Sequence, residues 1–425
     1  MNQPSSPPPL VSDVRTISVV SVAHSGSHFC QLMVPPLFPW IAPAFGLSNT
    51  QLGLLMSMFF IVSGVGQALA GFVVDRHGAE RVLFGGLALM ALAALGLGAS
   101  PNYAMLLVFM AVAGLGNCVF HPVDFSILNA RVHNTRLGHA YAAHGISGSL
   151  GWALAPMLMV GIAALSSWRV ALFAAAALIG AILAAMVWQR AHLSAAREAA
   201  PSVGAVAGAG AARAASTLGG MAATAESKFD FLRLPAIWAC FGFFFIFAAA
   251  LGGVQSFAPA AAAKIHGISA EQVAMCLSAY MLCGAVAMVF GGQLLRDPRR
   301  SALIAALGFG FAALVALAIG LGHWPPFWVP VLCGLMGIGS GLAGPSRDLL
   351  VKQATPPGAT GRVYGVVYSG LDAGIVVAPL LFGVLMDAGY FRAVWLGVAA
   401  FFALLIVTAF NVKRSSRAVP RAALA

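Results

Sequence analysis

Charged residues are scarce in this chain: of 425 residues, 8% are Asp, Glu, Lys or Arg, whereas 60% are hydrophobic. A soluble domain carries about 25% charged residues, so the chain lacks the polar surface that water requires. Its mean hydropathy is +0.91. The apolar runs are too long and too uniform for membrane barrel strands of roughly ten alternating residues. The composition therefore predicts an all-α integral membrane protein.

Catalytic motifs are also lacking. The sequence contains no HExxH, no GxSxG and no phosphate-binding P-loop, the patterns that supply residues for hydrolysis or for ATP-driven pumping. We therefore expect neither an enzyme nor a primary pump, and no cofactor. Any transport must then be driven by an ion or substrate gradient.

Cysteine is rare, and no two of the six cysteines form a CxxC pair. All of them fall within apolar segments, which predicts reduced packing residues rather than a disulfide framework or a metal site. We accordingly expect no resident metal. The six are Cys30, Cys118, Cys240, Cys276, Cys283 and Cys333.

The chain has instead twelve apolar segments, each near the ~20 residues that cross a bilayer as a helix. They cover residues 16–43, 51–74, 82–99, 103–128, 139–163, 169–189, 234–258, 270–295, 301–321, 325–349, 361–386 and 392–411. We predict a disordered tail at 1–15, a six-helix bundle at 16–189, a cytoplasmic linker rich in Ala and Gly at 190–233, a second six-helix bundle at 234–411 and a basic tail at 412–425.

The positive charge is distributed to one side of these segments. Of 23 Lys and Arg residues, only Arg169, Lys264 and Arg392 fall on the side opposite the termini. Because basic loops remain in the cytoplasm, we predict a multi-pass inner-membrane protein with both termini cytoplasmic. This topology accounts for the net charge of +11 without a nucleic-acid partner.

The two bundles are related by an internal repeat. The stretch Gly114 to Pro156 returns at Gly337 to Pro379 without a gap, and GLSNTQ from Gly46 returns as GISAEQ from Gly267. Gly114, Gly116, Pro122, Gly138, Tyr141, Gly151 and Pro156 fall on Gly337, Gly339, Pro345, Gly361, Tyr364, Gly374 and Pro379. The sequence therefore predicts two homologous halves in the same membrane orientation.

Two parallel six-helix repeats resemble the plan of the major facilitator superfamily, whose substrate site lies near the midplane between the halves. The stretch from Gly71 to Arg81, with Asp75, Arg76 and Gly78 in register, resembles the loop signature of that superfamily. Its second-half copy is degenerate. The arginine of the helix-4 signature is absent, because Met110 takes its place, which removes one proton-relay candidate.

The stretch Gly151 to Pro156 resembles a weakened antiporter motif, or else serves only close packing of helices. His28 to Gln31 and Val119 to Asp124 resemble the fosmidomycin-resistance-type branch of drug exporters. This resemblance implies a proton-driven, monomeric exporter of small, often anionic or amphipathic compounds.

Polar residues within the spans are the candidates for the substrate cavity, because each is costly in lipid. His24, His28 and Gln31 share one helix face, as do Asn117, His121 and Asp124. In the superfamily, spans 1, 4, 7 and 10 line the cavity, which directs both faces toward the substrate. A buried histidine can equally be a packing residue. The cavity candidates are His24, His28, Gln31, Asn117, His121, His144, Gln255 and Tyr368.

Asp372 is the leading candidate for proton coupling. It lies eleven residues into span 11, about 16 Å along a helix from its start and near the midplane. His28 and His121 are the alternatives. The competing interpretation of Asp372 is a structural carboxyl group that accepts a hydrogen bond from Tyr368.

Two cytoplasmic gates are predicted. In the first, Asp75 would lie at the positive start of span 11 and so close the cytoplasmic side; its residues are Gly71, Asp75, Arg76, Gly78 and Arg81. The alternative is that these charges only set the membrane topology. Asp124 and Arg347, equivalent in the repeat, would form an ion pair between spans 4 and 10. Pro122 and Pro345 remove backbone donors just before this pair and would act as matched hinges.

Together these patterns favour proton-coupled export of a small organic compound. Proton-coupled uptake of an organic anion is the first alternative. Divalent metal efflux through His24, His28, His121 and Asp372 is a weaker one. A membrane sensor without transport would need a folded cytoplasmic domain, which the linker at 190–233 does not provide.

Overall fold

The computed structural model describes residues 10–193, 235–294, 300–354 and 360–417. Within these ranges every regular element is a helix, and no strand occurs. The elements are α1 (Leu10–Gln31), η1 (Pro35–Leu37), α2 (Phe38–Phe45), α3 (Asn49–His77), α4 (Ala79–Ala99), α5 (Tyr103–Asn117), α6 (Phe120–Arg131), η2 (Asn134–Arg136), α7 (Leu137–Leu165), α8 (Trp168–Trp188), η3 (Arg190–His192), α10 (Pro235–Ser256), α11 (Ala258–His266), α12 (Ala270–Leu294), α13 (Ser301–Leu321), α14 (Trp328–Ala354), α15 (Thr360–Asp387) and α16 (Phe391–Arg417).

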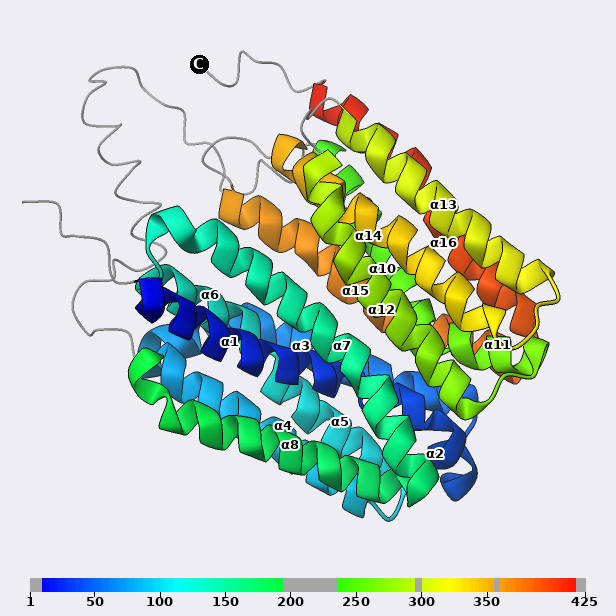
Figure 1. The fold of residues 1–425 in the computed structure, drawn as a ribbon, viewed down its shortest axis with the longest axis horizontal. Coiled ribbons are helices and arrows are strands. Elements are labelled where there is room, and N and C mark those ends of the chain that lie inside the picture. Colours follow the sequence, from blue (N-terminus) through cyan, green and yellow to red (C-terminus); the bar gives the residue numbers. More distant parts are fainter. Residues whose placement is uncertain (1–9, 194–234, 295–299, 355–359, 418–425) are drawn as a thin grey trace, which may run out of the picture.

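The helices form two bundles that lie side by side, α1 to α8 and α10 to α16 (Figure 1). Eleven of the described helical segments are long and apolar enough to cross a membrane, with α5 and α6 counted as one. The remaining span is α1, whose polar residues lower its hydropathy but which packs on α7, α6 and α8. The all-helical, twelve-span architecture predicted from composition is confirmed.

The sequence repeat reappears as repeated packing. A Cβ atom added to Gly116 of α5 would lie 2.8 Å from the carbonyl oxygen of Gly86, and one added to Gly339 of α14 would lie 2.7 Å from that of Gly308. No side chain fits at these distances. The conserved spacing of these glycines between the halves therefore follows from backbone contact between equivalent helices.

The same duplication governs two capping arrangements. The guanidinium of Arg169 donates to the carbonyls of Gly98 and Ser100 at the end of α4, and Arg392 donates to Gly320 and Leu321 at the end of α13. Capping boxes open α3 and α12. They use the pairs Ser48 with Gln51 and Ser269 with Gln272.

Gly151 and Gly374, from the weakened antiporter motif and its repeat, also pack closely. A Cβ atom at Gly151 would overlap the carbonyl oxygen of Ser25 in α1, and one at Gly374 would overlap that of Phe245 in α10. Both halves thus use the motif for the same helix contact, which favours the packing interpretation.

The first span is broken, which corrects the prediction of a continuous helix at 16–43, and the span predicted at 234–258 is followed by a short helix that was not predicted. After Gln31 the chain turns through η1 into α2, and after Ser256 it restarts as α11, which ends at His266. Pro35, Pro36 and Pro259 lie at these breaks, where proline cannot donate the helical hydrogen bond. The short segments α2 and α11 lie at the same end of the molecule (Figure 1).

The helices also extend into the predicted tails. α1 begins at Leu10, within the predicted tail 1–15, because Asp13 is completely buried and ties the helix to its neighbours. Oδ2 of Asp13 pairs with Nη1 of Arg136 at 2.9 Å and accepts a hydrogen bond from the backbone N–H of His133. At the other terminus, α16 reaches Arg417. Most of the predicted linker, 194–233, lies outside the described residues.

Candidate functional site: the contact between the bundles

The two bundles touch along α3 and α15. The hydroxyl of Ser57 donates to the carbonyl of Val376 at 2.7 Å. A Cβ atom at Gly53 would overlap the carbonyl oxygen of Pro379. These residues belong to different bundles, so the missing side chain of Gly53 and the short one of Ser57 let the two bundles approach at backbone distance.

A carboxylate closes this contact at the end where α2 and α11 lie. Asp387, the last residue of α15, accepts the backbone N–H groups of Asn49 and Thr50 at 2.6 and 2.8 Å, the side-chain amide of Asn49 at 2.9 Å and the hydroxyl of Thr50 at 2.6 Å. An anion at the start of a helix satisfies free N–H groups and complements the helix dipole. Sequence reasoning missed this clamp, although an acid at the end of span 11 was visible.

A second contact joins α7 and α12. The hydroxyl of Ser278 donates to the carbonyl of Ala153 at 2.7 Å. Ala153 lies in the second half of α7 and Ser278 in the first half of α12, so this contact is also nearer the end that carries α2 and α11. We call this end the clamped end, and the opposite end, with Arg76, Arg81 and Arg136, the basic end.

Asp372 lies at the end of the described α3–α15 contacts. A Cβ atom at Gly64 would lie 3.3 Å from Cβ and 3.5 Å from Oδ2 of Asp372. Toward the basic end, Gly71 has no atom within 4 Å of its Cβ position, and Phe72 is 74% exposed. Asp372 is half-buried and faces Gly64 of the other bundle. The side chain of Tyr368 lies outside the described residues, so a hydrogen bond between the two stays a prediction.

Asn117 is the centre of a hydrogen-bond network inside the first bundle. Its side-chain oxygen accepts bonds from Ser27 Oγ at 2.8 Å and Gln31 Nε2 at 3.1 Å, and its amide donates to Ser63 Oγ at 2.8 Å. Gln31 in turn accepts the indole N–H of Trp152 at 2.9 Å. The network joins α1, α3, α5 and α7. Asn117 and Gln31 are therefore engaged in holding the bundle together.

The predicted polar faces of α1 and α6 meet, and α7 adds a member. Nδ1 of His24 lies 2.9 Å from Oδ2 of Asp124, and Nε2 of His144 lies 3.0 Å from the same oxygen. The rings of His24 and His144 stack with centroids 3.5 Å apart, and His28 and His121 lie 4.4 and 5.3 Å from His24. Sequence reasoning named all five residues, but spacing along the chain did not indicate that Asp124 would face His24 and His144.

Neither predicted gate is formed by an ion pair among the described residues, and both stay predictions. Asp75, Arg76 and Arg81 are exposed, and none forms an ion pair with the residues that the structure describes. Asp124 is completely buried against histidines of its own bundle. The side chain of Arg347 lies outside the described residues, so its pairing with Asp124 stays a prediction.

The two predicted hinges differ. α5 ends at Asn117 and α6 begins at Phe120, a break next to Cys118, the residue whose carbonyl lacks a donor because of Pro122. In contrast, α14 continues through Pro345 to Ala354. The matched pair of prolines therefore interrupts only one of the two equivalent helices here.

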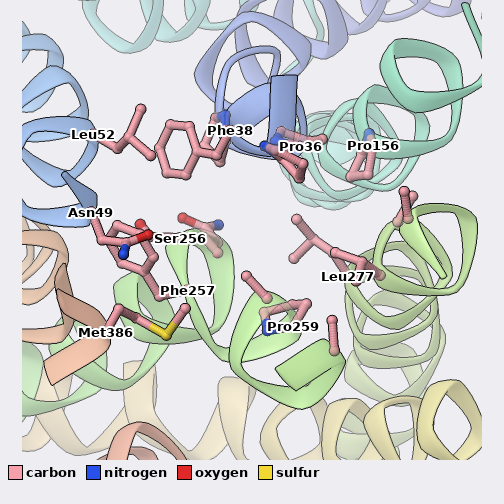
Figure 2. Close-up of a pocket in the computed structure, with 18 of the residues that line it drawn as sticks. Pro36, Phe38, Asn49, Leu52, Pro156, Ser256, Phe257, Pro259, Leu277 and Met386 are labelled. Carbon is pink, nitrogen blue, oxygen red and sulfur yellow. The ribbon is translucent and has the colours of Figure 1, made fainter. Parts of the chain in front are cut away.

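A cavity of about 360 Å³ lies between the bundles at the clamped end. Figure 2 shows Pro36, Phe38 and Pro156 from the first bundle facing Phe257, Pro259 and Leu277 from the second. Gln255, a predicted cavity residue, lines it; this side chain is 3% exposed, and Nε2 has no hydrogen-bond partner among the described residues. The cavity thus combines an apolar wall with an amide donor.

Comparisons with known proteins agree with this architecture. The sequence model of the Major Facilitator Superfamily matches residues 20–318 and 243–424. The chain is 29% identical over 140 residues to an uncharacterised transporter of that type, YfnC of Bacillus subtilis (strain 168), covering 33% of this chain and 34% of the relative. It is 26% identical over 179 residues to the fosmidomycin resistance protein of Escherichia coli (strain K12), covering 40% and 42%. The chain thus spans well under half the length of the curated relatives that it matches.

One solved structure covers nearly the whole fold. It is a bacterial homologue of the human lysosomal transporter Spinster, in an inward-facing and occupied conformation, with a TM-score of 0.73 over 94% of this chain and 95% of that one. The identity is 13%, so this likeness shows the fold alone.

Proposed function

The chain belongs to the Major Facilitator Superfamily, and we propose that it exports a small organic compound in exchange for protons by alternating access. The observation that carries the proposal is the contact between the bundles: the described contacts of α3 with α15 run from Asp387 to Asp372. Two bodies joined at one end can close the other end by rocking about the contact.

The orientation follows from charge. The basic end carries Arg76, Arg81 and Arg136, whereas the clamped end carries few basic residues. Under the positive-inside rule the basic end is cytoplasmic. The clamped contact would then lie on the outer side, which agrees with a state that is closed to the outside and loads a substrate for export from the cytoplasm.

Asp372 would carry the coupled proton. It lies between the bundles, next to Gly64 and at the end of the described contacts, so rocking exposes its carboxyl group to one side of the membrane and then to the other. A charged carboxylate in this position is costly when the bundles close around it. The substrate-free carrier would therefore return from the outward-open to the inward-open state with this carboxyl group protonated. It would take the proton from the outside and release it to the cytoplasm before the next substrate is carried out.

The names of two relatives favour export: the fosmidomycin resistance protein of Escherichia coli and a multidrug resistance protein B homologue of Mycobacterium tuberculosis (strain ATCC 25618 / H37Rv). Proton-coupled uptake of an organic acid is the second candidate. It is favoured by relatives named as probable transporters of L-galactonate, from Escherichia coli (strain K12), and of 4-methylmuconolactone, from Cupriavidus pinatubonensis (strain JMP 134 / LMG 1197). Metal efflux has less support, because Asp372 belongs to the other bundle and the histidines to the first.

The test is transport into proteoliposomes of defined orientation with an imposed pH gradient and a panel of small phosphonates, aromatic acids and amphipathic cations. An acidic interior should drive uptake of at least one compound into inside-out vesicles. Asp372→Asn should abolish this gradient-driven uptake while retaining exchange of labelled for unlabelled compound, because exchange needs no net proton movement. Glu271→Gln, at an exposed acid of α12, is the control and should transport normally. Gradient-driven uptake that persists in Asp372→Asn would contradict the coupling role.

A further inference from the structure

Four ligand-type side chains converge inside the first bundle in a pattern that proton coupling by Asp372 does not use. One ring nitrogen from each of His24, His121 and His144 lies within 4.8 Å of the other two. The carboxylate oxygen Oδ2 of Asp124 lies 2.9 Å from Nδ1 of His24 and 3.0 Å from Nε2 of His144. The ligands come from α1, α6 and α7.

These distances are close to those of a tetrahedral metal centre. Zinc binds imidazole nitrogen and carboxylate oxygen at about 2.0–2.2 Å, so neighbouring ligand atoms of a tetrahedron are roughly 3.3–3.5 Å apart. The contacts of Asp124, 2.9 and 3.0 Å, are shorter than this edge, and the histidine nitrogens are separated by up to 4.8 Å. Binding would therefore require the side chains to rotate about χ1 and χ2 so that the four atoms face a common centre.

Several polar atoms of the cluster lack partners. Nδ1 of His121, Oδ1 of Asp124 and both ring nitrogens of His28 are buried without a hydrogen bond to any described residue, and Nδ1 of His24 has its close contact to Asp124 without hydrogen-bond geometry. Buried polar groups are nearly always satisfied, so each exception calls for an explanation. The Asn117 network, in the same bundle, is by contrast fully paired.

We propose that His24, His121, His144 and Asp124 form a binding site for a divalent transition-metal ion, with Zn²⁺ as the best match. Three imidazoles with one carboxylate suit zinc, cobalt and nickel, and disfavour magnesium and calcium, which take oxygen ligands. A dication would also neutralise the carboxylate of Asp124, which is completely buried and otherwise costly in the membrane interior.

The ion would be resident rather than transported. All four ligands belong to one bundle, so a bound ion would move with that bundle and would not pass between the two halves. Its structural effect would fall on α6, which is separated from α5 by the break at residues 118–119. Coordination by His121 and Asp124 would tie this short helix to α1 and α7. The site extends beyond the proposed transport function and does not depend on it.

The test uses the full chain purified in detergent, stripped with EDTA and dialysed against buffered Zn²⁺ and, separately, Co²⁺. Bound zinc is measured by atomic emission, and the visible spectrum of Co²⁺ reports coordination geometry, because tetrahedral cobalt absorbs far more strongly than octahedral cobalt. The variants are His144→Asn and Asp124→Asn. The matched control is His139→Asn, an exposed histidine one and a half turns earlier on α7.

The wild type and His139→Asn should bind one zinc ion per chain and give a tetrahedral cobalt spectrum. His144→Asn and Asp124→Asn should weaken binding by at least ~100-fold, since even outer-shell changes cost about 10–100-fold. Zinc binding that is unchanged in both variants, or no zinc in the wild type, would overturn the assignment. Should both variants fail to fold, an octahedral cobalt spectrum in the wild type would overturn it. These measurements need no transport, so their failure is distinct from failure of gradient-driven uptake.

Discussion

The clamp between Asp387 and the start of α3 offers the sharpest test of the closed end. Asp387→Asn keeps the size and one oxygen acceptor of the side chain but removes the negative charge and the second acceptor. The carboxylate receives four hydrogen bonds from Asn49 and Thr50, two on each oxygen. The single oxygen of the amide can keep two of them, so two are lost. We expect the clamped end to open more often.

The magnitude follows from the lost interactions. Hydrogen bonds to charged groups contribute about 1.5–3 kcal/mol each, but Asp387 is exposed and solvent replaces much of that. The lost interaction with the helix dipole costs about 0.3–1 kcal/mol. Together with the two lost hydrogen bonds, the closed state loses roughly 1–2 kcal/mol of stabilisation. The ratio of open to closed molecules should then rise by about 5- to 30-fold.

A single cysteine in the cavity measures this ratio. Ala274 lines the cavity and is 2% exposed, so Ala274→Cys, in a background without the six native cysteines, reacts with a bulky thiol reagent only when the clamped end opens. The labelling rate in detergent should rise by about 5- to 30-fold with Asp387→Asn, in proportion to the open fraction.

The control removes the charge of an acid that does not join the bundles. Glu271 is an exposed acid of α12 that belongs neither to the clamp nor to the predicted gates, and Glu271→Gln should leave the labelling rate of Ala274→Cys unchanged. A labelling rate that rises less than about twofold with Asp387→Asn would refute the assignment of the clamp as a closing interaction. Such a rise is well below the tenfold change that corresponds to 1.4 kcal/mol. An equal rise with both variants would refute its specificity.

Three further predictions concern packing, the polar network and pH. Gly53→Leu should prevent the α3–α15 contact at Pro379 and abolish transport while the protein still folds. Gly180→Leu, at a glycine of α8 with open space around it, should transport normally. Loss of transport in both variants would argue against a specific contact. Asn117→Ala should lower the stability by about 2 kcal/mol, taking ~0.6 kcal/mol for each of three hydrogen bonds within a membrane bundle. Thermal unfolding in detergent measures this loss. An equal loss with Asn129→Ala, which removes an exposed amide, would contradict the prediction. Burial lowers the pKa of His266, at the end of α11, below its usual 6.5, and the charge of Arg392 lowers it further. Because the unfolded chain then binds this proton more readily, stability should fall as the pH drops below about 6.5, and a melting curve of His266→Gln should show a smaller fall; an unchanged pH profile would exclude His266 as the cause.

Much of the architecture was predictable because it is written in local composition. Apolar segments of about twenty residues, the asymmetric placement of Lys and Arg, and the repeat of Gly114 to Pro156 each depend on neighbours in the chain. These features predicted a helical membrane protein of two homologous halves, and the resemblance carried by the Gly71 to Arg81 loop indicated the family. The breaks after Gln31 and Ser256 were missed, although Pro35, Pro36 and Pro259 marked them.

The candidate site was only half predictable. Helical spacing correctly grouped His24 with His28 and His121 with Asp124, because residues three, four or seven apart share a face whatever the fold. The same reasoning could not tell which face of α7 would turn toward them. It therefore listed His144 only as one cavity residue among several and assigned Asp124 a partner in the other bundle.

By itself the sequence determined that the protein lies in a membrane and how many spans it has, since both follow from the energy of transferring contiguous segments into lipid. It also showed the duplication, because the same residues return at a constant offset. Only the tertiary structure decided which polar groups meet. Asn49 and Asp387 are 338 residues apart, and His144 approaches Asp124 across two helices. Such pairs depend on the relative rotation and depth of whole helices, which packing at glycines such as Gly53 and Gly116 sets and which no local pattern encodes.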